Sequence, residues 1–242
     1  MDTELLIPEL PAGKGLVVLL SGGLDSSVLA YALAARGIPI KALTVIYGQR
    51  HSKEQEAAAA IAGHLNIEHK VLGVRALREL LGNSCALVSE DLKIPEGHYE
   101  AESMQETVVP NRNMILLSLA TAWSVALGFA GVAYAAHAGD HAIYADCRPE
   151  FADALAAAIA LCDDSPQQLL RPFMRLKKDQ IAALGAKLDV PLKLTWSCYN
   201  GRALHCGKCG TCTERIEAFA RSGIVDPTRY ETEAGPPATE HQ

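Results

Sequence analysis

Short apolar runs alternate with longer mixed segments along most of the chain. The first run is rich in valine and leucine, which is typical of a parallel strand covered on both faces. Strands are predicted at 16–20, 40–47, 69–74, 131–137 and 169–173. Helices are predicted from residue 28 to near Gly37 and at 52–65, 113–127, 149–161 and 177–188. The alternation predicts an α/β fold, a Rossmann-like parallel sheet with right-handed crossovers, and such sheets bind ligands beyond the carboxyl ends of their strands.

Two segments depart from this alternation. Residues 82–110 form a long polar stretch with few periodic cues, which predicts a functional or mobile loop. From about Leu192 the chain becomes rich in cysteine and glycine, followed by a predicted helix at 213–221. We therefore expect a nucleotide-binding and catalytic domain over 1–190, a small C-terminal region over 191–230 and a disordered tail over 231–242.

Composition narrows the choice of partner. The 242 residues are 49% hydrophobic, which is ample for a buried core, and 22 basic against 28 acidic residues give a net charge of −6. A nucleic-acid backbone usually needs a basic excess, so a small-molecule partner is favoured. The start of the chain does not resemble a signal peptide, and no apolar run reaches the ~18–20 residues of a membrane helix. We expect a cytoplasmic protein with no membrane partner, whose seven cysteines are not a disulfide framework.

The segment after the first predicted strand has the character of an anion site. Glycines let the backbone N–H groups approach a phosphate, and the helix N-terminus adds partial positive charge. An ordinary strand-to-helix turn, capped by serine or aspartate, is the alternative. The spacing matches neither G-x-x-x-x-G-K-[ST] nor G-x-G-x-x-G. The segment consists of Ser21, Gly22, Gly23, Leu24, Asp25, Ser26 and Ser27.

This segment resembles S-G-G-x-D-S, the pyrophosphate loop of the PP-loop ATP pyrophosphatase family, which has an adenine nucleotide alpha hydrolase-like fold. The resemblance implies that the loop holds the β,γ-pyrophosphate of ATP, that cleavage occurs at the α-phosphorus, and that Mg²⁺ accompanies the ATP. The implied ATP-binding stretch comprises Leu19, Leu20, Ser21, Gly22, Gly23, Leu24, Asp25, Ser26, Ser27, Val28 and Leu29.

Four closely spaced cysteines predict a metal site. Cys198, Cys206, Cys209 and Cys212 suit one tetrahedral zinc ion per chain, because glycines between the C-x₂-C pairs permit tight turns around it. A redox dithiol is the main alternative, since C-x-x-C also describes thioredoxin-like sites. A closed four-thiolate site has no open position for a substrate, so a zinc ion here would be structural.

Further motifs together resemble the 7-cyano-7-deazaguanine synthase family, a PP-loop family of queuosine precursor biosynthesis. The resemblance covers about residues 15–230, and one departure is Ala145, where the family pattern has proline. The motifs lie at 47–51 (YGQRH), 109–113 (VPNRN), 146–151 (DCRPEF) and 196–201 (WSCYNG). The resemblance implies an ATP-dependent ligase that converts 7-carboxy-7-deazaguanine and ammonia to the 7-nitrile, through an adenylated carboxylate and an adenylated amide.

The same resemblance suggests catalytic residues. Asp25 and Ser26 belong to the loop, and Lys178 resembles a family lysine that steadies charge on the α-phosphate. A solvated helix face is the ordinary interpretation of such a lysine. Arg112 is a candidate for binding phosphate or the purine-like base. Asp146 and Arg148 suit either the same role or a buried ion pair.

Other functions remain open from sequence. A tRNA sulfur-inserting relative would need a basic face or an added RNA-binding domain. A nucleotide-binding protein without turnover would bind ATP without carboxylate-dependent AMP release. A relative that attaches a deazaguanine to a protein is a further alternative. The sequence does not fix the oligomeric state, and a homodimer is compatible with it.

Overall fold

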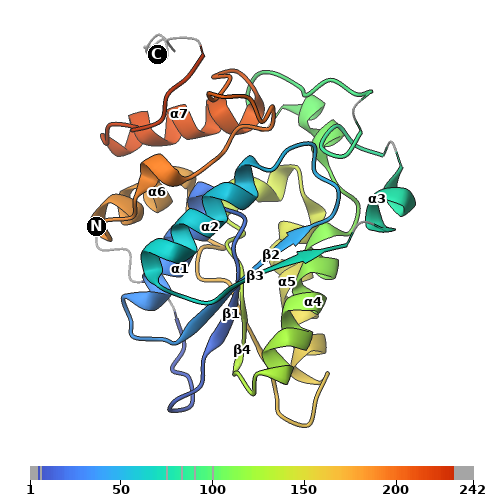
Figure 1. Ribbon diagram of the computed structural model, residues 1–242, viewed down its shortest axis with the longest axis vertical. Helices are drawn as coiled ribbons and strands as arrows, with labels where there is room; N and C mark the ends of the chain where they lie inside the picture. The colour runs from blue at the N-terminus through green and yellow to red at the C-terminus, as the bar shows by residue number, and fades with distance from the viewer. Residues whose placement is uncertain are drawn as a thin grey trace.

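A five-stranded parallel sheet forms the centre of the molecule (Figure 1). The computed structural model describes residue 5 and residues 7–231, apart from residues 75, 83, 90 and 100. The strand order is β3-β2-β1-β4-β5, and every neighbouring pair is parallel. The strands are β1 (Leu16–Leu19), β2 (Ile40–Ile46), β3 (His69–Gly73), β4 (Gly131–Ala133) and β5 (Gln168–Leu170). The predicted α/β fold with a parallel sheet is therefore confirmed.

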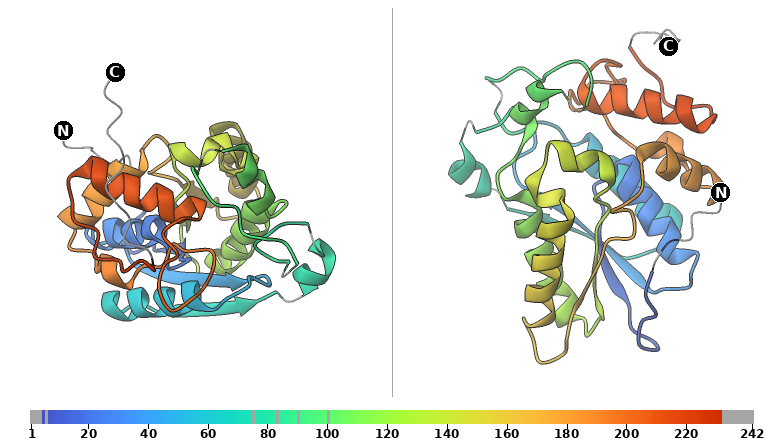
Figure 2. Two further views of the ribbon diagram at one scale, coloured as in Figure 1. Left: turned by 90° about the horizontal axis from the view of Figure 1, so that it is seen from above. Right: turned by 180° about the vertical axis from the view of Figure 1, so that it is seen from behind.

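Helices cover both faces of the sheet (Figures 1 and 2). On one face α1 packs against α2 and α6, and α7 packs along α6; α4 and α5 lie on the other face. The helices are α1 (Leu24–Ala34), α2 (Lys53–Leu65), α3 (Ala76–Leu81), α4 (Arg112–Ala126), α5 (Pro149–Ala160), α6 (Lys178–Lys187) and α7 (Gly210–Ser222). Short 3₁₀ helices lie at Glu102–Thr107, Ala138–Ala142, Ala145–Cys147 and Leu192–Leu194.

The central strand β1 explains the first apolar run. Leu16 and Val18 pack into the core beneath α1, whereas Val17 packs into the core beneath α4, because successive side chains of a strand point to opposite faces. All three are fully buried. Each such side chain contributes about 1.5–3 kcal/mol relative to exposure, so both faces of the run stabilise the sheet.

Several element boundaries differ from the sequence-based ones. Helix α1 begins at Leu24, four residues before the predicted start at residue 28, and α7 begins at Gly210 rather than 213. Strand β4 ends at Ala133, and the short helix α3 was not predicted. The expected loop at 82–110 is largely irregular, yet Cys85, Val88 and Met104 within it are buried. Of the predicted disordered tail at 231–242, residues 232–242 lie outside the described residues.

Among the described helices, none combines the length and the hydropathy that a membrane span requires.

Candidate active site

A cavity of about 510 Å³ opens at the carboxyl ends of β1 and β2. All four predicted catalytic residues, Asp25, Ser26, Lys178 and Arg112, line it although they come from α1, α6 and α4. Of the predicted ATP-binding stretch, the residues that line the cavity are Leu19, Leu20, Ser21, Gly23, Leu24, Asp25 and Ser26. The remaining four, Gly22, Ser27, Val28 and Leu29, are buried beneath the loop or in the core.

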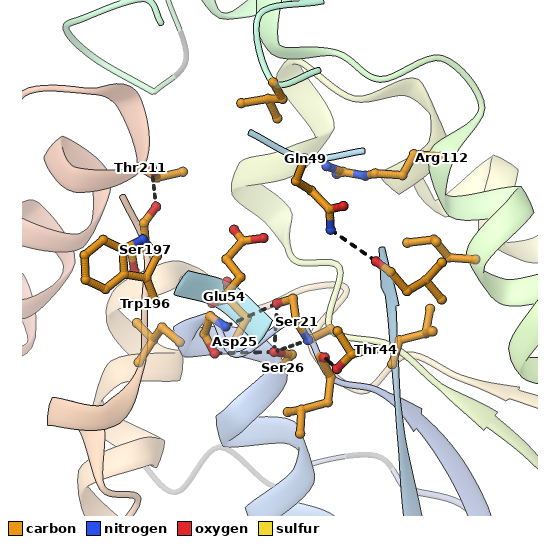
Figure 3. Close-up of a pocket in the computed structure, with 18 of the residues that line it drawn as sticks. Ser21, Asp25, Ser26, Thr44, Gln49, Glu54, Arg112, Trp196, Ser197 and Thr211 are labelled. Carbon is orange, nitrogen blue, oxygen red and sulfur yellow. Dashed lines mark hydrogen bonds between the residues drawn. The ribbon is translucent and has the colours of Figure 1, made fainter. Parts of the chain in front are cut away.

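The loop between β1 and α1 is held by its own hydroxyl groups at the floor of this cavity (Figure 3). The hydroxyls of Ser21 and Ser26 are 3.0 Å apart, and the backbone N–H of Gly23 donates to Ser21 Oγ over 3.2 Å. Ser27 Oγ donates to the Gly23 carbonyl over 2.7 Å. Gly22 has φ +85, and a Cβ there would collide with the backbone of Glu54 and Ala58 in α2. The loop therefore seats closely on α2, with the N-terminus of α1 facing the cavity.

Lys178 is the cation of a buried charged cluster. Its Nζ lies 2.6 Å from Asp25 Oδ2, 3.2 Å from Glu214 Oε2 and 3.3 Å from His137 Nε2. The side chain is only 15% exposed, so the solvated-face interpretation is wrong. Burial alone would lower the pKa of Lys178, but the charges of Asp25, Glu214 and Asp140 offset this and raise it above its usual value. Lys178 is therefore positively charged at neutral pH, and its charge stabilises the ionised form of Asp25 in the loop.

Carboxylates outnumber cations in this cluster. Burial raises the pKa of Asp25, but Lys178 and His137 outweigh this and hold it below the usual value. Asp140 accepts from the Tyr99 hydroxyl over 3.0 Å and from the His137 backbone N–H over 3.1 Å. One wall beside the loop thus carries Asp25, Asp140 and Glu214 around a single lysine. Surplus negative charge of this kind favours a cation bound with a polyphosphate.

Arg112 lies on the side of the cavity opposite Trp196 (Figure 3). Tyrosine side chains surround its guanidinium group. The guanidinium carbon is 5.6 Å from the centroid of Tyr144. Burial raises the pKa of Tyr47 and Tyr199, and the positive charge of Arg112 opposes this rise. The Tyr144 hydroxyl is 3.3 Å from that of Tyr199. Burial would lower the pKa of Arg112, but the tyrosines around it contribute to holding it well above its usual value. The arrangement presents a fixed cation to whatever enters the cavity.

The other motif residues have local structural partners. Gln49 accepts from the Tyr47 N–H over 2.8 Å and donates to the Val45 carbonyl over 3.1 Å, so it closes the turn after β2. Asp146 accepts from the Asn113 N–H over 2.9 Å at the start of α4, and Arg148 donates to the His141 carbonyl. Within the described part of the chain Asp146 and Arg148 form no ion pair with each other, so the buried-pair alternative is wrong.

The four predicted cysteine ligands converge beside the cavity. The Sγ atoms of Cys198, Cys206, Cys209 and Cys212 all lie within 4.8 Å of one another, and all four side chains are buried. Backbone N–H groups donate to Cys198 Sγ from Asn200 and Cys206, over 3.4 and 3.3 Å. Such donors stabilise thiolates, and four converging sulfurs fit a metal better than a dithiol pair does. Trp196 and Ser197, just before the first cysteine, line the cavity.

Three charged residues of the cavity were missed by sequence reasoning: Glu54, Asp140 and Glu214. Asp140 follows β4 within the 3₁₀ helix Ala138–Ala142, and Glu214 lies in α7 just after the last cysteine. Glu54 lies in the first turn of α2, three residues after the YGQRH motif. A carboxylate next to that motif was the only local signal for any of them.

Comparisons with known proteins agree with this geometry. Residues 15–223 match the family model described as queuosine biosynthesis protein QueC. The chain is 49% identical over 215 residues to the 7-cyano-7-deazaguanine synthase of Marinobacter nauticus, covering 89% of this chain and 96% of the relative. It is 47% identical over 217 residues to that of Caldicellulosiruptor saccharolyticus, covering 90% and 96%.

Solved structures show the same fold at low identity. The NMN synthetase of Francisella tularensis superposes with a TM-score of 0.50 at 20% identity, covering 88% of this chain and 79% of that one. A predicted tRNA methyltransferase subunit from Methanocaldococcus jannaschii gives 0.50 at 18% identity, covering 92% and 94%. The sequence matches go further than the fold: the chain belongs to the queuosine biosynthesis protein QueC family.

Proposed function

We propose that the chain is an ATP-dependent carbon–nitrogen ligase that converts 7-carboxy-7-deazaguanine and ammonia to 7-cyano-7-deazaguanine. The carrying observation is that the S-G-G-x-D-S loop, Lys178 and Arg112 face one cavity. The names of the curated relatives support the substrate. An acidic chain, with a net charge of −6, also fits a small molecule better than a nucleic acid.

The chemistry needs two activations in one pocket. A carboxylate oxygen attacks the α-phosphorus of ATP, pyrophosphate leaves, and the acyl adenylate forms. Ammonia then displaces AMP and loses a proton, which gives the amide. The amide oxygen attacks a second ATP, pyrophosphate leaves again, and loss of the nitrogen-bound protons with AMP gives the nitrile. Each oxygen of the original carboxylate therefore leaves on AMP.

The position of each residue in the cavity suggests its role in the two activations. The backbone N–H groups of the loop and the hydroxyls of Ser21 and Ser26 can donate hydrogen bonds to the β,γ-phosphates, which leave together as pyrophosphate. Lys178 supplies positive charge beside them, and Arg112 supplies it from the opposite side. Asp25 and Glu214, next to Lys178, would hold the Mg²⁺ that accompanies ATP. A Mg²⁺ ion held there would neutralise charge on the pyrophosphate.

A direct assay tests the proposal. Purified protein is mixed with ATP, Mg²⁺, ammonium and 7-carboxy-7-deazaguanine, and the products are read by mass spectrometry. The expected product is the nitrile, with AMP, and neither should form when the deazaguanine is omitted. ATP binding without carboxylate-dependent AMP release would contradict the proposal and favour a non-catalytic nucleotide-binding protein.

We further infer that the chain works in the cytoplasm. A homodimer stays a prediction.

Zinc is the metal we propose for the cysteine cluster, because four thiolates whose sulfurs lie within 4.8 Å of one another suit it and leave no open position. The protein purified without chelators should carry about one zinc ion per chain. Cys206→Ser should lose zinc and soluble protein together, because binding energy of a structural metal is folding energy. Exposed Cys162→Ser is the matched control and should change neither. Full zinc and full solubility in Cys206→Ser, measured by metal analysis and soluble yield, would exclude the site.

A further inference from the structure

We infer that Glu54 is the general base of the nitrogen-transfer steps, accepting protons first from the attacking ammonia and then from the amide nitrogen. The inference rests on the proposed ligase function and assigns a group to the proton transfers that this function requires. Three observations carry it: the position of Glu54, its lack of partners, and the charged groups that face it.

The backbone fixes Glu54 against the loop. Helix α2 begins at Lys53, so Glu54 lies in its first turn, and its carbonyl packs where any side chain at Gly22 would collide. The side chain extends away from that contact and into the cavity, between Ser21 on the floor and Arg112 on the far side (Figure 3). A carboxylate in this position is next to the space between the phosphate loop and the fixed cation.

Among the described carboxylates that line the cavity, Glu54 is the one without a hydrogen-bond or ion-pair partner. Asp25 and Glu214 pair with Lys178, and Asp140 accepts two hydrogen bonds. In the described part of the chain, by contrast, Glu54 makes no hydrogen bond or ion pair. Its helix neighbour Glu56 is bonded at the surface to Ser52 and Lys53. An unpaired carboxylate is free to take up a proton without first breaking a contact.

The groups around Glu54 tune it for this task. Arg112 faces it from α4, Tyr47 from the end of β2, and Tyr199 from the segment after Cys198. Burial raises the pKa of Glu54 to about 7, while the charge of Arg112 acts in the opposite direction. A base is most effective when its pKa is near the working pH. Asp25, whose pKa is held low by Lys178 and His137, is a much weaker base.

The proton balance assigns Glu54 a role in both rounds. When ammonia attacks the acyl adenylate, the new C–N bond forms, the C–O bond to AMP breaks, and Glu54 accepts one proton from nitrogen. In the second round the adenylated amide must lose its remaining nitrogen-bound protons as the second C–O bond breaks. Glu54 returns each proton to water between steps. Adenylation itself transfers no proton, so it does not require this base.

Glu54→Gln, which keeps the shape and removes the basicity, separates these steps. Carboxylate-dependent ATP–pyrophosphate exchange without ammonia should stay within about threefold of wild type, whereas amide and nitrile formation should fall at least about 100-fold. In the wild type, with the concentration of free ammonia held constant at each pH, the nitrogen step should lose rate as the pH falls below about 7, and this limb should vanish in the variant. Glu56→Gln, on the exposed side of the same helix, is the control and should behave like wild type.

Each other outcome has a definite meaning. A raised KM for the deazaguanine with unchanged kcat would make Glu54 a binding residue and overturn the inference. Equal loss of exchange and nitrogen transfer would also overturn it. If Glu54→Gln does not fold, Glu54→Asp and the wild-type pH profile decide: absence of the low-pH limb refutes the base. Failure of the ligase proposal looks different, because wild type itself would then release no carboxylate-dependent AMP.

Discussion

Lys178→Met is expected to lower the rate of AMP formation by about 10²–10³-fold, the usual effect of removing one preorganised charge from developing negative charge. Lys178 is held 2.6 Å from Asp25 and is 15% exposed, so it is positioned before ATP enters. Its loss also leaves Asp25 and Glu214 without their shared cation. Single-turnover measurement of carboxylate-dependent AMP formation reads the effect on the chemical step.

Two comparisons make this result specific. Lys193→Met removes an exposed lysine of the same region and should leave AMP formation unchanged. Lys178→Arg keeps the charge but changes its shape, and it should recover only part of the rate, because guanidinium and ammonium differ in geometry. A Lys178→Met rate within a few-fold of wild type, in folded protein, would show that this lysine does not act on the phosphate.

Arg215→Met is expected to destabilise the protein by about 3–5 kcal/mol, because it leaves a buried carboxylate uncompensated. Arg215 is fully buried in α7 and contacts both oxygens of Asp226. It also donates to Thr195 Oγ1 over 2.8 Å and to the Leu192 carbonyl over 3.2 Å, which ties α7 to the segment before Trp196. For a chain of this size, that loss corresponds to a fall in Tm of roughly 6–20 °C.

The pH dependence of this defect has a definite sign. In the wild type, burial raises the pKa of Asp226, but its hydrogen bonds to Arg215 and Tyr230 hold it below the usual 3.8. Without Arg215 the buried carboxylate costs most when it is charged. The stability difference should therefore shrink as the pH falls and Asp226 becomes protonated. Arg221→Met, which breaks only the exposed pair with Glu217, should cost under about 1 kcal/mol. Equal effects of the two variants would contradict the account.

Much of the fold could be predicted because its signals are local. Strand β1 is an uninterrupted apolar run, and the five strands alternate with helices along the sequence. Errors arose where tertiary contacts decide the boundary. Helix α1 starts early because Gly23 is extended and accepts from the Ser27 hydroxyl, and α3 has only six residues, too few for a helical pattern.

In the candidate site, too, the residues with local sequence signals were predicted, and those that depend on tertiary contacts were not. The phosphate loop and the four cysteines are contiguous motifs, so they could be predicted from the sequence directly. Lys178 and Arg112 were predicted only through the resemblance to a family. Glu214 lies 189 positions from Asp25, yet both contact the same lysine. Only the packing of α7 along α6 brings them together. Glu54 was missed because its isolation from partners, which makes it chemically informative, is a property of the folded cavity.

The fate of the two carboxylate oxygens tests the central claim most directly. The reaction is run from 7-carboxy-7-deazaguanine labelled with heavy oxygen at both carboxylate positions, with ammonium, Mg²⁺ and unlabelled ATP, and the nucleotides are analysed by mass spectrometry. Activation at the α-phosphorus in both rounds predicts two AMP per nitrile, each carrying one heavy oxygen, with unlabelled pyrophosphate. Labelled inorganic phosphate formed with ADP, in protein free of contaminating kinases, would contradict the assignment of the loop as a pyrophosphate-releasing site.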